Sequence, residues 1–180
     1  MVYLALLRGI NVGGNNRVEM PRLRAVCESA GLTDVRTYIN TGNVIFEDPQ
    51  RSPAELTAVL QDGIAAEFGL NLKVLVRDLG EMTEVVRRLP DTWVNDSTMK
   101  CDVMFLWDEV DDPSILQELT IKQDIDDVLY VPGAIIWRVD KDRVTRSGLL
   151  RIVGTDLYKK MTIRNCNTVR KLVSLMEAMP

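Results

Sequence analysis

The sequence predicts an α+β fold made of two ferredoxin-like-related α/β lobes packed together, with C-terminal helices. Short apolar runs of strand length alternate with amphipathic helical stretches over the first half, in the order strand-helix-strand-strand-helix-strand. A similar succession follows in the second half. The chain has 180 residues, which is enough for one domain or two small ones with a buried core.

The first lobe is predicted to occupy residues 1–90. Pro21 and Gly31 mark the first turn and the end of its first helix. Ser52 and Glu55 form a capping box ahead of the second helix, and the sequence NTGN at positions 40–43 is typical of a hairpin turn. The predicted strands are Val2–Leu7, Val35–Asn40, Val44–Glu47 and Leu72–Arg77, and the predicted helices are Met20–Ala30, Pro53–Phe68 and a third between Asp78 and Pro90.

The second lobe is predicted to occupy residues 101–180, after a joint at Asp91–Lys100. Its order is strand-helix-strand-strand-helix, and a further helix stands where the first lobe has its last strand. No residue-level repeat accompanies this pattern, so the two lobes also fit a single domain. The predicted strands are Cys101–Trp107, Val128–Val131 and Ile135–Val139, and the predicted helices are Pro113–Leu119, Gly148–Tyr158 and Thr168–Ala178.

The composition excludes several kinds of chemistry. The chain has no histidine, so Ser-His-Asp and Cys-His machinery and histidine-based metal sites are excluded. Its three cysteines are widely spaced, which predicts neither a disulfide framework nor a metal site. No apolar stretch approaches the roughly 20 residues of a membrane helix. We therefore expect a cytoplasmic protein with no metal, no cofactor and no membrane partner, and its oligomeric state stays open.

The charge is distributed unevenly along the chain. Residues 141–180 carry nine Lys and Arg against three Asp and Glu, whereas residues 1–140 carry 13 against 23. A basic end indicates either an anionic partner or packing of this end against the acidic body of the protein.

Two polar segments of the first lobe are expected to lie close together. A strand-helix-strand crossover makes the first two strands parallel, so both strands end at the same edge of the sheet. The loop from Arg8 to Asn16 and the hairpin tip at positions 40–43 follow these ends. Seven of the nine asparagines lie in these two segments and in a third near Asn165. Their amides suit recognition of polar ligands, and they equally suit turns.

Arginines accompany these segments. Arg8 and Arg17 flank the glycine-rich loop, whose glycine spacing matches neither the dinucleotide fingerprint nor the P-loop. Glycine backbone between two arginines suits a phosphate. Arg164 and Asn165 are expected at a helix N-terminus, which favours an anion, although Asn165 also fits a plain N-cap.

Three segments together resemble a bacterial family, the domain of unknown function 1697. They are LLRGINVGG from Leu6, TYINTGNVIF at Thr37–Phe46 and TIRNCNTVRKL at Thr162–Leu172. The resemblance spans essentially the whole chain, and it implies a two-lobed α+β fold related to ferredoxin-like units with no established activity. The sequence departs from the family twice, because Asn40-Thr41 replaces the more usual Gln-Ser and Cys166 replaces a tryptophan.

The candidate ligand-binding residues are those that match these motifs, together with Arg17. They are Arg8, Asn11, Gly13, Gly14, Arg17, Gly42, Asn43, Arg164, Asn165 and Thr168. No catalytic residue is assigned.

Three functions remain open at this stage. The first is a binding protein for an anionic ligand, such as a nucleotide or nucleic acid, in which arginines meet phosphates and asparagines contact polar edges. The second is an enzyme acting on a phosphorylated or carboxylated small molecule, with a carboxylate or Tyr38 as the acid-base group. The third is purely structural, with Arg164 docking one lobe onto the other through a carboxylate.

Overall fold

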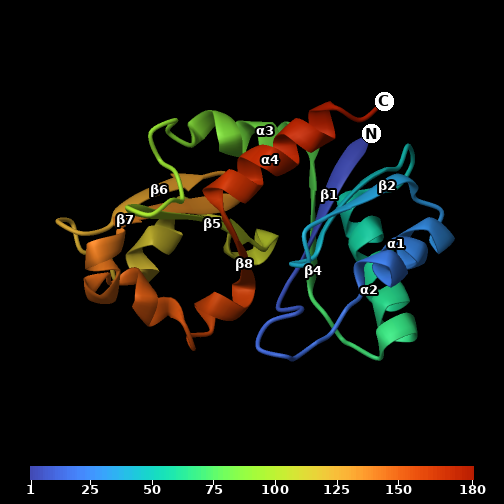
Figure 1. Cartoon of the computed structure of the whole chain (residues 1–180), viewed down its shortest axis with the longest axis horizontal. Coiled ribbons are helices and arrows are strands. Elements are labelled where there is room, and N and C mark those ends of the chain that lie inside the picture. The colour runs from blue at the N-terminus through green and yellow to red at the C-terminus, as the bar shows by residue number, and fades with distance from the viewer. The chain divides into compact units, whose positions relative to one another are not determined.

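The computed structural model describes the whole chain, residues 1–180. The chain divides into two compact units (Figure 1). The first contains Met1–Met82 and Leu172–Pro180, and the second contains Thr83–Lys171. Each unit contains one four-stranded antiparallel sheet, which confirms the predicted α+β class. None of the helices has the length and apolar character needed to cross a membrane.

The first unit has the predicted order strand-helix-strand-strand-helix-strand. Its elements are β1 (Val2–Leu7), α1 (Met20–Ser29), β2 (Thr33–Tyr38), β3 (Asn43–Glu47), α2 (Pro53–Phe68) and β4 (Val74–Asp78). The strands lie in the order β2-β3-β1-β4, and every neighbouring pair is antiparallel. This is the ferredoxin-like arrangement. Because β3 separates β1 from β2, these two strands run parallel, as the crossover requires.

Local sequence signals set the ends of α2 and of the next helix, α3 (Leu79–Arg88). Ser52 and Glu55 form both hydrogen bonds of the capping box, and Gly69 ends α2 with a φ of 66°. At α3 the backbone N–H of Glu81 donates to Asp78 Oδ1 at 2.8 Å, and the N–H of Asp78 donates to Glu81 Oε2 at 2.9 Å. Both predicted helix starts are therefore confirmed.

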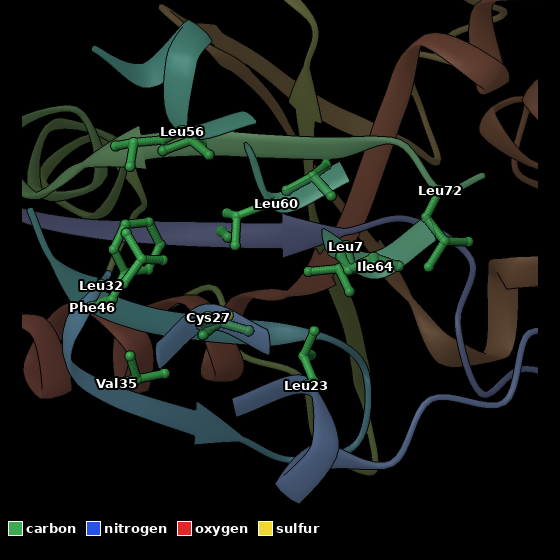
Figure 2. Close-up of a cluster of buried hydrophobic side chains, with 14 of the residues drawn as sticks. Leu7, Leu23, Cys27, Leu32, Val35, Phe46, Leu56, Leu60, Ile64 and Leu72 are labelled. Atoms are coloured by element: carbon green, nitrogen blue, oxygen red, sulfur yellow. The ribbon is translucent and has the colours of Figure 1, made fainter. Parts of the chain in front are cut away.

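The apolar core of the first unit lies between its sheet and the helices α1 and α2. Leu23 and Cys27 of α1 and Leu60 of α2 pack in one cluster with Leu7 of β1 and Phe46 of β3 (Figure 2). Each large apolar side chain buried in this way contributes about 1.5–3 kcal/mol of stabilisation. This cluster fixes β1 and β3 in the centre of the sheet.

The second unit has the same strand order as the first, and the fourth strand of its sheet was not predicted. Its strands are β5 (Met99–Leu106), β6 (Asp127–Val131), β7 (Ala134–Asp140) and β8 (Met161–Asn165), in the order β6-β7-β5-β8. The segment that forms β8 was expected to lie between two helices. β8 has only five residues, and its polar residues Thr162 and Arg164 are buried while Ile163 is half-buried, so its short alternation does not have the apolar buried face of a typical half-buried strand.

Two predicted helices of the second unit are only short 3₁₀ turns. The segments are η2 (Pro113–Glu118), η4 (Leu149–Ile152) and η5 (Leu157–Lys160), beside the further turns η1 (Asp108–Val110) and η3 (Lys141–Arg146). Gly154, with a φ of 87°, lies between η4 and η5 and prevents a continuous helix. These turns carry apolar residues of the unit's core, such as Ile115, Leu149 and Leu157. The last helix, α4 (Cys166–Glu177), begins two residues earlier than predicted.

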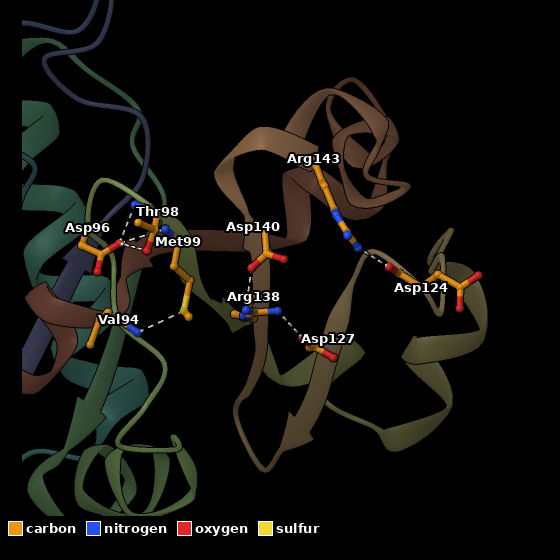
Figure 3. A network of polar contacts seen from close by, with 9 residues as sticks. All are labelled: Val94, Asp96, Thr98, Met99, Asp124, Asp127, Arg138, Asp140 and Arg143. Carbon is orange, nitrogen blue, oxygen red and sulfur yellow. Dashed lines mark hydrogen bonds and ion pairs between the residues drawn. The ribbon is translucent and has the colours of Figure 1, made fainter.

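Polar contacts join the edge strand β6 of this sheet to its neighbour β7. Arg138 of β7 donates to Asp127 of β6 at 2.8 Å and to Asp140 at 2.6 Å (Figure 3). Arg138 and Asp127 face each other across the two strands, so the pair stabilises their register. Arg143 of η3 donates to the backbone carbonyl of Asp124 at 3.2 Å.

A buried carboxylate organises the segments that cover this sheet. Asp126 Oδ1 accepts from the indole of Trp137 at 3.1 Å and from the hydroxyl of Ser147, and Oδ2 accepts from the N–H groups of Lys122 and Gly148. Burial alone raises the pKa of Asp126, but these hydrogen bonds outweigh it, and the pKa lies below the ordinary value.

Asp126→Asn is expected to destabilise the protein by about 1–3 kcal/mol at pH 7, because an amide cannot accept all four hydrogen bonds. The lowered pKa of Asp126 stabilises the fold above the unfolded-state pKa of about 4, and this stabilisation is lost as the pH falls through the folded-state pKa. Urea unfolding at pH 7 and pH 3 measures both effects. Asp124→Asn, at an exposed position, is the matched control; an equal loss in the two variants contradicts the prediction.

Candidate functional site

The glycine-rich loop after β1 folds into a small hairpin of its own. The N–H of Asn15 donates to the carbonyl of Val12 at 3.0 Å, and the N–H of Asn11 donates to the carbonyl of Asn16 at 3.1 Å. Gly13 and Gly14, with φ of 58° and 81°, occupy the two central positions of the turn. A two-residue hairpin turn with positive φ at both centres requires such residues. These two glycines therefore build the turn.

Asn11 ties three segments together. Its Nδ2 donates to the carbonyls of Val18 and Asn40, at 2.9 and 2.8 Å, and its Oδ1 accepts from the N–H of Val18 at 2.9 Å. The backbone N–H of Leu7 also donates to the carbonyl of Gly42 at 2.8 Å. The loop and the hairpin tip thus lie side by side, which confirms the proximity predicted from the strand order. The amide of Asn11 is occupied by these contacts.

Gly42 and Asn43 are buried parts of the β2–β3 connection. Asn43 is 0% exposed, and its Nδ2 donates to the carbonyl of Tyr38 and to the hydroxyl of Thr41, both at 3.0 Å. Gly42 has a φ of 81°, and a Cβ there would lie 2.7 Å from Leu7 Cβ and 2.8 Å from Ile10 Cδ1. Both residues hold the connection in shape beneath the surface.

Gly42→Ala is expected to cost about 2–4 kcal/mol of unfolding free energy, because the added methyl meets both a positive φ and two neighbouring side chains. Gly69→Ala is the matched control, since Gly69 has a φ of 66° with nothing within 4 Å of the added atom. That variant is expected to lose only about 1 kcal/mol. Thermal and urea unfolding compare the two, and losses of equal size contradict the steric argument.

An open groove lies beside these segments on the first unit. It has a volume of about 510 Å³ and is lined by Asn11, Gly14, Asn15, Arg17, Val18, Glu19, Met20, Pro21 and Asn40. Of the predicted site residues, Asn11, Gly14 and Arg17 line it. Arg8, Gly13, Gly42 and Asn43 do not, although they belong to the same two segments. Asn15, Asn40 and Glu19 are lining residues that were not among the predicted site residues.

The start of α1 forms one side of the groove. Glu19 is the N-cap residue and makes no side-chain capping hydrogen bond, and the first turn of α1 contains no acidic residue. Free N–H groups at such an end attract negative charge. Arg17 is exposed beside it, and Glu19, also exposed, contributes the one carboxylate of the lining. The groove therefore combines one cation, one anion, side-chain amides and an uncapped helix end.

Two exposed apolar residues stand on the same segments. Val12 is 66% exposed in the glycine-rich loop, and Ile39 is 47% exposed next to Asn40. Ile39 has a φ of 48°, a conformation that costs a β-branched residue about 1–3 kcal/mol. Nothing in the sequence marks an isoleucine for this conformation, so Ile39 was not anticipated.

The second-unit candidates lie at the junction of β8 and α4. Asn165 Oδ1 accepts from the N–H of Thr168 at 2.9 Å, so Asn165 is the N-cap of α4. Arg164 is only 8% exposed, and its Nη1 donates to Thr162 Oγ1 at 3.1 Å and to the carbonyl of Ile163 at 2.8 Å. Burial lowers the pKa of Arg164 to about 10. Thr168 is 8% exposed as well, so Arg164 and Thr168 offer little surface to a ligand.

No group of three or more acidic or cysteine side chains is placed to hold a metal ion. A cavity of the second unit, about 300 Å³, is lined by residues of η4, η5 and the segment before β6, and none of the predicted site residues contributes to it.

Comparison with known proteins identifies relatives of the chain. The model of a family described as a protein of unknown function (DUF1697) matches residues 1–137. The chain belongs to this family. The matched range includes the glycine-rich loop and the β2–β3 hairpin. Membership of the DUF1697 family assigns no function to the groove, because the family's description states none.

A solved structure extends the likeness over nearly the whole chain. The conserved bacterial protein SP0830 from Streptococcus pneumoniae is 26% identical in sequence, with a TM-score of 0.83 over 97% of this chain and 98% of that one. No curated protein sequence matches the chain. The likeness to SP0830 thus extends to the segment of β8 and α4, beyond the range of the family match.

Proposed function

We propose that this protein binds an anionic ligand in the groove of its first unit, and that the ligand is a nucleotide, either free or within a nucleic acid. The observation that carries the proposal is the uncapped N-terminus of α1, which lines the groove beside the exposed cation of Arg17. A phosphate placed there would meet backbone N–H groups, the positive end of the helix and a guanidinium.

The amides of the groove suit the rest of a nucleotide. Asn15 and Asn40 are exposed lining residues, and a side-chain amide both donates to and accepts from the polar edge of a base or a ribose hydroxyl. The exposed side chains of Val12 and Ile39 on the same two segments supply apolar surface against which a base can pack. The groove is open, which fits a ligand that extends beyond it.

The same features favour binding over catalysis. A general acid or base is usually held in an enclosed pocket within reach of the reacting group. The carboxylate of the groove, Glu19, is exposed, and Tyr38 does not line the groove. An enzyme acting on a phosphorylated or carboxylated small molecule therefore receives less support.

Fluorescence anisotropy with labelled single-stranded RNA, single-stranded DNA and mononucleotides tests the proposal. Arg17→Ala is expected to weaken binding roughly tenfold through the loss of a charge-assisted contact. Glu19→Gln is expected to strengthen it about two- to fivefold, because it removes a repelling charge from the groove. Arg36→Ala, which removes an exposed arginine of β2, is the matched control and is expected to leave affinity unchanged.

The salt dependence distinguishes the ligands. Binding of an oligonucleotide falls with salt, and the slope decreases by about 1 in Arg17→Ala. Saturation by mononucleotides alone identifies a free nucleotide as the ligand. The proposal is wrong if no member of the panel shows salt-sensitive binding, or if Arg17→Ala and Arg36→Ala behave alike.

Arg164 is better explained by a structural role, because its guanidinium is buried and donates to Thr162 and Ile163 of its own strand. Arg164→Met keeps much of the apolar stem and removes these hydrogen bonds. We expect a loss of about 1–3 kcal/mol of unfolding free energy with unchanged affinity in the anisotropy assay. Weaker binding with unchanged unfolding free energy would instead assign Arg164 to the ligand.

A further inference from the structure

The second unit contains two buried thiols at the end of the β5–β8 pairing. Asp102 of β5 and Asn165 of β8 form the last pair of this antiparallel ladder. Cys101 and Cys166 are the next residues along, and both are 0% exposed. Ladder partners such as Asp102 and Asn165 have Cα atoms about 4.5–5.5 Å apart, so the adjoining Cys101 of β5 and Cys166, the first residue of α4, are placed at about the separation that a disulfide spans. A hydrogen bond already joins the two side chains.

The surroundings make the two cysteines chemically unequal. The hydrogen bond from Cys101 lowers the pKa of Cys166; burial opposes this, and the guanidinium of Arg170 lowers the pKa further. The carboxylate of Asp102 raises the pKa of Cys166. The pKa of Cys101 is raised, first by the same hydrogen bond and then by burial. Cys166 is therefore the better nucleophile of the pair.

The segment Trp93–Asn95 covers Cys166. Its Sγ donates to the carbonyl of Trp93 at 3.5 Å, and Arg170 Nη1 donates to the same carbonyl at 2.8 Å. Asn167 Nδ2 donates to the carbonyl of Asn95 at 2.8 Å, and Asn167 Oδ1 accepts from its N–H at 3.2 Å.

This covering segment has irregular backbone between α3 and β5, and Trp93–Asn95 are only half-buried. Figure 3 shows how the chain continues from this segment into β5. The N–H of Val94 donates to Met99 Sδ, and Asp96 accepts from the N–H and the hydroxyl of Thr98. A half-exposed segment of irregular backbone opens locally at lower cost than a buried strand or helix. Such opening admits a small reagent to Cys166.

We propose that Cys166 and Cys101 are a redox-active pair that a hydroperoxide converts into a reversible disulfide. The Cys166 thiolate attacks one peroxide oxygen, the O–O bond breaks, and the leaving oxygen takes up a proton, which yields water or an alcohol and a sulfenic acid. The Cys101 sulfur then attacks the Cys166 sulfur, the S–S bond forms, and the S–O bond breaks. The leaving hydroxide takes the Cys101 proton as water. The peroxide gains the two electrons that the thiols lose.

The test uses the full-length protein treated with hydrogen peroxide, followed by intact mass and peptide mapping without reductant. The wild type is expected to lose two hydrogen atoms and to give one cross-linked peptide joining Cys101 to Cys166, which dithiothreitol reverses. Cys27→Ser is the matched control and is expected to react identically, because burial raises the pKa of Cys27 to about 12. In Cys101→Ser the reaction stops at the sulfenic acid, which dimedone traps on Cys166.

A second variant tests the covering segment. Asn167→Ala removes the contacts with Asn95 and the Oδ1 that accepts from Cys166 Sγ at 3.5 Å, and it is expected to speed disulfide formation severalfold without changing the two cysteines that are joined. The wild-type measurement needs no substitution, so a variant that fails to fold does not decide the result. The proposal is overturned if peroxide leaves the folded wild type reduced, if the cross-link involves Cys27, or if dimedone labels Cys27 as readily as Cys166 in Cys101→Ser.

Discussion

The side chain of Asn11 is the contact on which the surface of the first unit depends. It joins the glycine-rich loop, the start of α1 and the tip of the β2–β3 hairpin through three hydrogen bonds. This is possible because β1 and β2 run parallel on either side of β3, so that both end at one edge of the sheet. The groove beside Arg17 exists because the three segments are held in this way.

Asparagines and glycines at neighbouring positions of this sheet edge have different structural roles. The side-chain amides of Asn11 and Asn43 form hydrogen bonds within the protein, whereas Asn15 and Asn40 line the groove. Gly13 and Gly14 have open space where a side chain would stand, but Gly42 lies against Leu7 and Ile10. The structure of this edge thus accounts for Gly42 and Asn43, whereas Asn15, Arg17 and Asn40 are the residues on which the proposed binding rests.

The second unit reaches the same strand order with a different way of covering its sheet. Short 3₁₀ turns take the place of the two helices, and they are joined by the carboxylate of Asp126 instead of a regular helical face. Gly148 allows this approach, because a Cβ there would lie 2.1 Å from the carbonyl oxygen of Thr120. A buried charge is tolerable here since each carboxylate oxygen accepts two hydrogen bonds.

The sequence by itself determined the α+β class, the first unit's element order and the capped starts of α2 and α3, because periodicity and caps are local signals. It also determined that the loop and the hairpin tip meet. Only the tertiary structure decided that Met161–Asn165 is a strand, since pairing with β5 overrides a weak local pattern. It likewise decided which asparagines, glycines and arginines face a groove. An amide serves a turn, a cap or a ligand equally well, so its role depends on which distant residues the fold brings beside it.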